Sequence, residues 1–103
     1  MAKLTLVASP TFKCKVAIPV AGGPSVDVEF VFKHRTKDAL DELIKTRAEQ
    51  SDADTVMAVI AGWDLEDSFD RTAVELLLQN YIGASLAIYR EYVDQLVQAK
   101  AKN

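Results

Sequence analysis

The chain has one cysteine, one histidine and no long apolar run, and these shortages exclude several classes of protein. Cys14 has no second cysteine with which to form an internal disulfide, so the disulfide framework of a small secreted domain is excluded. No apolar run reaches the roughly 18–20 residues that cross a bilayer, and no apolar signal segment opens the sequence. We therefore expect a cytosolic protein that has no contact with a membrane.

Catalytic residues are equally scarce. His34 is the only histidine, and a Ser–His–Asp or Cys–His arrangement would have to use it. It lies between Lys33 and Arg35 at a strand-to-helix junction, and we interpret it as a surface or packing residue. Cys14 falls on the apolar face of a predicted strand, where a free cysteine packs as a small hydrophobe. We expect a protein that is not an enzyme; a small enzyme or regulator that uses His34 is an alternative.

The charge balance does not favour nucleic acid, metal or phosphate as ligands. The net charge is −3, whereas nucleic-acid binding requires a clustered basic face. The basic cluster within residues 33–37 is typical of a solvated helix entrance. The acidic loop at residues 64–70 lacks the glycine and the terminal glutamate of a calcium-binding EF-hand, and Gly22-Gly23-Pro24 lacks the spacing of a phosphate loop. We expect no nucleic acid, no metal and no cofactor.

A β-hairpin is the clearest local signal. Apolar and polar residues alternate strictly from Phe12 to Val20 and again from Val26 to Lys33, which is the pattern of two half-buried strands. Gly22-Gly23-Pro24 between them is a turn sequence. A two-stranded hairpin is marginal alone, so this one, within residues 12–33, must pack on helices. Residues 1–10 are expected to be a loose arm or a third short strand.

The remainder, residues 36–100, is predicted to be helical. Thr36 and Ser51 or Asp52 are expected N-caps of two helices. Four large apolar residues at i, i+3, i+4 and i+7 predict that the second helix continues to the tryptophan: Val56, Val59, Ile60 and Trp63. Gly62 can take a positive φ, so we expect this helix to end near Trp63. The sequence as a whole predicts one α+β domain over residues 1–103, with a hairpin packed against about four helices.

The last two predicted helices have their own start and stop signals. Thr72 and Glu75 have the spacing of a capping box, Gly83 ends that helix, and Ser85 caps a last helix that runs to about Ala99. The last helix carries two adjacent apolar stripes, one of Leu86, Tyr89, Val93, Leu96 and Val97, the other of Ile88, Tyr92 and Ala99. A single core requires only one stripe. The wider face predicts a second contact, such as another copy of the chain.

Two segments together resemble the phage tail assembly chaperones of long-tailed phages. The first is F-V-F-K-H-R-T at Phe30–Thr36, followed by a charged helix. The second is V-M-A-V-I-A-G-W-D-L, then a phenylalanine, then A-V-E-L-L-L-Q-N-Y, and then two tyrosines in the last helix. The resemblance covers residues 30–96. Family members often have proline after the tyrosine that ends the third helix, whereas this chain has Ile82 and Gly83 there.

The resemblance implies a non-enzymatic role in the cytoplasm of the host cell. Proteins of this family bind the tape measure protein, keep it soluble, help bring tail tube subunits to it, and are absent from the mature virion. The resemblance, together with the wide apolar face of the last helix, predicts a homo-oligomer. We predict that four residues of the last helix face the partner: Tyr89, Tyr92, Val93 and Leu96.

Two alternatives stay open at this point. The four residues of the last helix could instead pack within the fold, on Trp63 and Leu77. The protein could instead be a structural component of the virion, such as a tail terminator or a head–tail connector, because these are also small α+β proteins that form rings.

Overall fold

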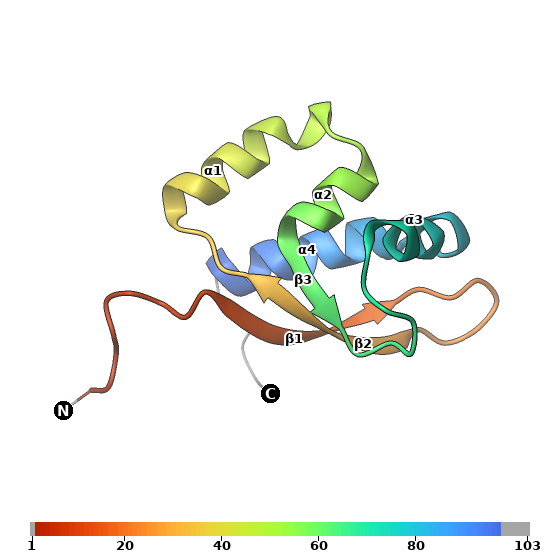
Figure 1. Cartoon of the computed structure of the whole chain (residues 1–103), viewed down its shortest axis with the longest axis horizontal. Helices are drawn as coiled ribbons and strands as arrows, with labels where there is room; N and C mark the ends of the chain where they lie inside the picture. The colour runs from red at the N-terminus through yellow and green to blue at the C-terminus, as the bar shows by residue number, and fades with distance from the viewer. Residues whose placement is uncertain (1, 98–103) are drawn as a thin grey trace.

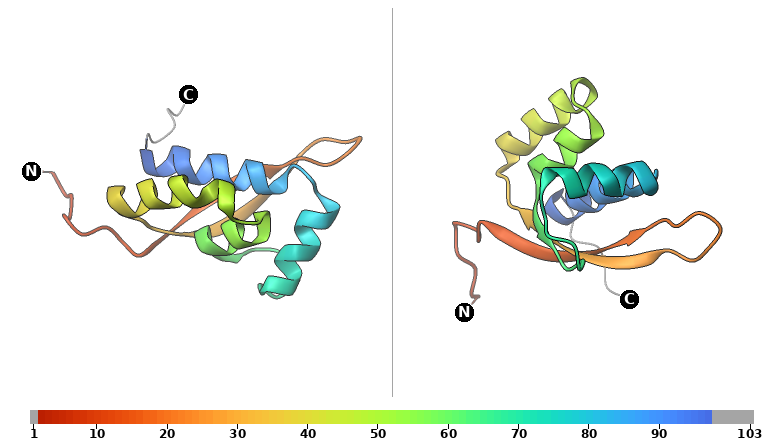
Figure 2. Two further views of the ribbon diagram at one scale, coloured as in Figure 1. Left: turned by 90° about the horizontal axis from the view of Figure 1, so that it is seen from above. Right: turned by 45° about the vertical axis from the view of Figure 1, so that its right-hand side comes forward.

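The computed structural model describes residues 2–97, which form a three-stranded antiparallel sheet and four α-helices. The elements follow in the order β1 (Thr11–Ile18), β2 (Val26–Lys33), α1 (Lys37–Thr46), the short 3-10 helix η1 (Arg47–Glu49), α2 (Asp52–Val59), β3 (Ile60–Trp63), α3 (Arg71–Asn80) and α4 (Ala84–Val97). The helices lie on one side of the sheet (Figures 1 and 2). The α+β class predicted from the sequence is confirmed. No helix of the described part is long and apolar enough to span a bilayer.

The predicted hairpin is present and its faces are as expected. β1 and β2 pair without interruption, from Thr11 opposite Lys33 to Ile18 opposite Val26. At the turn, the Gly23 N–H donates to the Val20 carbonyl at 3.2 Å. Gly22 there has a φ of 75°, the left-handed conformation that a side chain disfavours. The alternation of the sequence therefore places one face of the hairpin against the helices and the other toward solvent.

The third strand is not where the sequence suggested. Residues 2–10 form no strand, and the third strand is β3, within the part that was predicted to be helical. The prediction of a helix ending near Trp63 was wrong, because α2 ends at Val59. Ile60 already has the extended backbone of a strand, with φ −112° and ψ 147°.

Pairing with β2 explains why the helical period fails here. Phe32 lies opposite Ile60 and Phe30 opposite Trp63, with a bulge between the two pairs. The Asp64 N–H then donates to the Glu29 carbonyl at 3.1 Å. A helix through Trp63 would leave this edge of β2 without backbone partners, next to a fully buried phenylalanine, and unpaired buried backbone groups are costly. Tertiary pairing therefore overrides the local period.

The structure contains some of the predicted helix caps and lacks others. Thr36 and Ser51 accept hydrogen bonds from backbone N–H groups three residues on, as predicted for N-caps. The capping box at Thr72 was wrong: the N-cap of α3 is Asp70, whose Oδ1 accepts from the Ala73 N–H at 2.8 Å. Ser85 was also wrong as a cap, because α4 begins one residue earlier and Ser85 is buried inside it.

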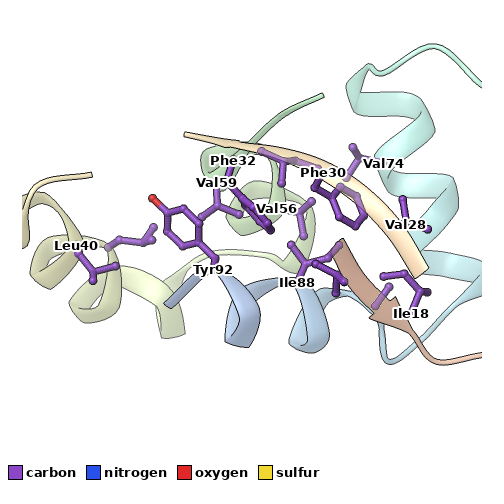
Figure 3. Close-up of a cluster of buried hydrophobic side chains, with 14 residues drawn as sticks. Ile18, Val28, Phe30, Phe32, Leu40, Val56, Val59, Val74, Ile88 and Tyr92 are labelled. Carbon is purple, nitrogen blue, oxygen red and sulfur yellow. The ribbon is translucent and has the colours of Figure 1, made fainter. Parts of the chain in front are cut away.

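The core lies between the sheet and the helices. Two phenylalanines of β2, Phe30 and Phe32, are fully buried, as are Ile88 and Tyr92 of α4 (Figure 3). Fully buried side chains of α2, β3 and α3 complete the centre of the core: Val56, Val59, Ile60 and Val74. The outer face of the hairpin exposes Lys13, Lys15 and Lys33. The fold thus has two layers, with one polar sheet face left open.

Candidate partner-binding groove

The structure divides the four partner-facing candidates of the last helix between core and surface. Tyr92 is fully buried, with 0% of its side chain exposed. Tyr89, Val93 and Leu96 are partly buried and pack against the core. The Tyr89 ring lies against the Arg47 guanidinium, 5.3 Å from the ring centroid. Only these three can reach a partner without a change in the core. Ala99, which was predicted to belong to the second apolar stripe of this helix, lies outside the described residues.

Tyr92 is tied to the strand-to-helix junction as well as buried. Its hydroxyl donates to the Lys33 carbonyl at 2.7 Å and accepts from Arg35 Nη1 at 3.0 Å. Its ring packs on Phe32 and Phe12, with centroid distances of 5.4 and 6.3 Å. Burial raises the pKa of the Tyr92 phenol, although Arg35 acts in the opposite direction. Tyr92 therefore packs within the fold, as the alternative proposed, but it packs on Phe12 and Phe32 instead of on Trp63 and Leu77.

An apolar groove lies at the other end of the molecule, between the turn end of the hairpin and α3. Its volume is about 710 Å³. Its walls are mostly apolar and come from both strands, from the segment after β3 and from α3; they include Ile18, Val28, Trp63, Leu65, Leu77 and Tyr81. The two charged residues among its lining, Asp67 and Asp70, are both acidic. The groove is thus an apolar surface with an acidic border.

Trp63 holds the loop that forms one wall of this groove. Its indole Nε1–H donates to the Asp67 carbonyl at 2.8 Å. Its ring meets Phe69 edge-on at 5.2 Å and Phe30 at 6.5 Å. The carboxylate of Asp64 accepts from the Glu29 N–H at 3.0 Å, which attaches the start of the loop to β2. The acidic loop therefore has a defined conformation, which hydrogen bonds and aromatic contacts hold in place along one side of the groove.

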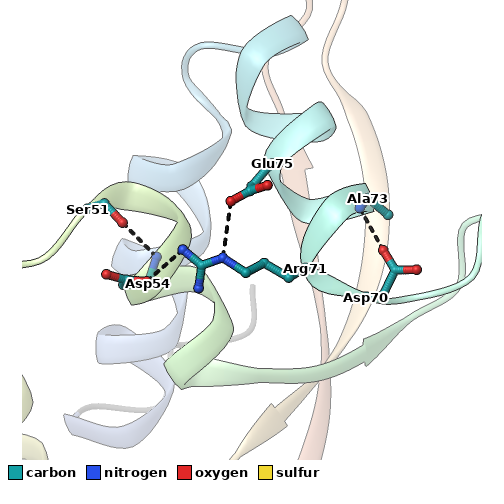
Figure 4. Close-up of polar contacts among 6 residues, drawn as sticks. All are labelled: Ser51, Asp54, Asp70, Arg71, Ala73 and Glu75. Carbon is teal, nitrogen blue, oxygen red and sulfur yellow. Dashed lines mark hydrogen bonds and ion pairs between the residues drawn. The ribbon is translucent and has the colours of Figure 1, made fainter.

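Arg71 fixes the position of α3, the opposite wall (Figure 4). Its guanidinium contacts Asp54 of α2 at 2.7 Å and Glu75 of α3 at 3.1 Å. The hydrogen bond from Arg71, followed by that from Ser51, lowers the pKa of the Asp54 carboxyl, and the same pairing with Asp54 and Glu75 raises the pKa of Arg71. Glu75 therefore takes part in an ion pair rather than in the predicted capping box.

Large apolar side chains are exposed around the groove. Leu76 of α3 is 63% exposed and Val26 of β2 is 55% exposed. Tyr81 is 39% exposed, and the next residue, Ile82, is 91% exposed. Exposed apolar residues are ordinary when scattered, but a contiguous group around a concave surface marks an interaction site. The geometry suits an apolar segment of a partner.

Sequence reasoning missed this groove, although one signal was available. Leu76, Leu77 and Leu78 are consecutive. Side chains on one face of a helix are three or four residues apart, so three consecutive residues cannot all point into the same core. Leu77 and Leu78 are partly buried, whereas Leu76 faces outward. The exposure of Val26 had no such signal, because it continues the alternation of buried residues along β2.

The described part of the chain offers little else for chemistry. Within residues 2–97, no group of three or more His, Cys, Asp or Glu side chains is placed to hold a metal ion. Cys14 is partly buried, and its Sγ lies 3.7 Å from Glu91 Oε2. The groove is therefore the strongest candidate for a functional site.

The comparisons with known proteins agree with the resemblance noted in the sequence. A family model described as phage tail assembly chaperone matches residues 1–103, which is the whole chain. Searches of curated proteins and of solved structures returned no match. The chain therefore belongs to the family of phage tail assembly chaperones.

Proposed function

We propose that this protein is a non-enzymatic chaperone that binds the tape measure protein during tail assembly, keeps it soluble and helps recruit tail tube subunits. The groove between the hairpin and α3 carries the proposal, because it is an open apolar surface on a member of the tail assembly chaperone family. The tape measure protein and the tail tube protein are the proposed partners. The host cytoplasm is the proposed location, and the mature virion is expected to lack the protein.

The chemistry of the groove suits a long helical client. Such a client exposes apolar side chains at i, i+3, i+4 and i+7, and a hydrophobic groove receives them along one face. Trp63 and Tyr81 provide large aromatic contacts of the kind that dominates binding energy at interfaces. Leu76, at the border, would bury more than half of its side chain when a client docks.

The outer side of α4 is a second proposed contact. Tyr89, Val93 and Leu96 are partly buried there, and Val97 is 63% exposed. We propose that copies bound along one client also contact one another through this side, because several copies on one client turn weak single contacts into strong overall binding. Tyr92 is left out of this surface, since it lies in the core.

Co-expression with the tape measure protein of the same phage tests the proposal. The wild-type chain is expected to bring the tape measure protein into the soluble fraction and to elute with it. Leu76→Asp places a charge in the groove and should abolish both effects. Ile44→Asp is the matched control, because Ile44 is exposed on α1, away from the groove, and should leave both effects intact.

Three outcomes would contradict parts of the proposal. A tape measure protein that stays insoluble and unbound with the wild-type chain contradicts the chaperone role. A loss on Val97→Asp with none on Leu76→Asp moves the client site from the groove to α4. A stoichiometric band of this protein in purified particles, detected by mass spectrometry, favours the alternative of a structural virion component.

A further inference from the structure

We propose that the groove of one copy is occupied by the N-terminal arm, residues 2–10, of a second copy until a client displaces it. This contact regulates the proposed client site, and in that respect it rests on the proposed function. Its own content is a contact between two copies of this chain, which can be tested without any client.

The arm is an apolar segment that its own molecule leaves uncovered. Leu4 is 85% exposed, Leu6 99% and Val7 86%. Within residues 2–97, the only hydrogen bond made by residues 2–9 is a local one, from the Thr5 hydroxyl to the Val7 carbonyl at 3.0 Å. The arm projects from the end of the sheet opposite the hairpin turn (Figures 1 and 2). Three neighbouring apolar side chains in water favour a contact that buries them.

The arm and the groove complement each other in charge. Lys3 is the only charged residue between positions 2 and 10. The groove's charged lining residues, Asp67 and Asp70, are both acidic. In an extended arm, Leu4 and Leu6 point to the same side, so both can enter the apolar groove while Lys3 remains at its border. Opposite charges at the edge of such a contact fix its register and disfavour wrong partners.

The arm is too short to place both Leu4 and Leu6 in the groove of the same molecule. Seven strand positions separate Thr11, where the arm ends, from Ile18 at the groove, a distance of roughly 23 Å. Fully extended, Leu4 is seven residues from Thr11 and reaches at most roughly 25 Å, which brings it only to the edge of the groove. Leu6 is five residues from Thr11 and reaches at most roughly 18 Å, and Val7 reaches less. The direct path along the inner sheet face is also filled by the core, including Phe12. The occupant is therefore the arm of another copy.

Two variants separate the two halves of this contact, because each of them loses one half and keeps the other. Leu4→Asp/Leu6→Asp destroys the arm and leaves the groove intact, whereas Leu76→Asp destroys the groove and leaves the arm intact. All three residues are more than half exposed, so both variants should fold and keep the circular dichroism spectrum of the wild type. Val26→Asp is a second groove variant on a different element, should Leu76→Asp alter the fold.

The experiment measures molar mass by size-exclusion chromatography with light scattering. The wild-type chain should have at least twice the mass of one chain, and each variant alone should be monomeric. An equimolar mixture of the arm variant and the groove variant should form a complex of two chains, because each supplies the half that the other lacks. Two copies of the same variant cannot do this.

Three results would overturn the inference: a monomeric wild type, an arm variant that keeps the wild-type mass, or a mixture of the two variants that stays monomeric. Each of them leaves the client test untouched, because no tape measure protein is present. Conversely, the arm variant has an intact groove and should solubilise the tape measure protein at least as well as the wild type. A failure of the wild type there, with successful pairing of the two variants, would contradict the proposed function alone.

Discussion

Removing the hydroxyl of Tyr92 tests whether this side chain is a structural element of the core. In Tyr92→Phe the ring and its contacts with Phe12 and Phe32 stay. The variant loses the bond to the Lys33 carbonyl at 2.7 Å and the bond from Arg35 at 3.0 Å. A net hydrogen bond contributes about 0.5–1.5 kcal/mol, and more when the partner is charged. Arg35 is only partly buried, so water partly replaces its bond, and both bonds count toward the low end of these ranges. We therefore expect a loss of about 1–2 kcal/mol in the free energy of unfolding.

That loss is measurable in a domain of this size. About 1 kcal/mol lowers the Tm by roughly 4–8 °C in a domain of 60–100 residues, so Tyr92→Phe should lower it by roughly 4–16 °C. The assay is chemical and thermal denaturation followed by circular dichroism. Tyr89→Phe is the matched control, since the Tyr89 hydroxyl makes no hydrogen bond within residues 2–97. The Tm of this variant should hardly change. A second comparison, Tyr92→Ala, removes the ring as well and should cost about 3–5 kcal/mol.

The pH dependence of stability provides an independent check. Burial raises the pKa of Tyr92 in the folded state. The contribution of this phenol to the free energy of unfolding is therefore fully present below the unfolded pKa of about 10, and it is lost as the pH rises through the folded pKa. Tyr92→Phe should remove this alkaline loss. Equal stabilities of Tyr92→Phe and Tyr89→Phe, with an unchanged alkaline limb, would refute the reasoning and return Tyr92 to the candidates for partner contact.

Two further predictions concern α3. Asp70→Ala should cost about 1 kcal/mol in the free energy of unfolding because it removes the N-cap, whereas Thr72→Ala should cost only a few tenths; the opposite order would restore the capping box at Thr72. Because Arg71 lowers the folded pKa of Asp54, the Asp54 contribution is present above the unfolded pKa of about 3.8 and is lost as the pH falls through the folded value. Urea denaturation from about pH 5 to about pH 2 should show a smaller acid loss in Asp54→Asn; an identical loss would exclude a contribution of this pair.

The sequence predicted those parts of the fold that depend on local chemistry. The hairpin follows from alternation and a glycine turn, both of which act over a few residues. β3 does not follow, because Val56–Trp63 has a helical period, and only the free edge of β2 in the folded molecule decides against it. An isolated sequence cannot weigh a local period against a distant hydrogen-bonding edge.

The candidate site was less predictable for a related reason. Two apolar stripes lie side by side on α4, and the sequence does not say which of them faces the sheet. The structure turns Ile88 and Tyr92 inward and leaves Leu86 and Val97 exposed, which reverses the expectation for Tyr92. The groove joins strand ends, a loop and α3, so its shape exists only after these segments have packed.

The position of Trp63 has a practical consequence. It is the only tryptophan of the chain, it lines the groove, and its indole is neither fully buried nor fully exposed. Indole emission shifts to shorter wavelength when water around the ring is replaced by apolar groups. An occupant of the groove, whether the arm of another copy or a client, thus changes the intrinsic fluorescence of the unlabelled protein. The molecule contains its own optical reporter at the surface where its function is proposed.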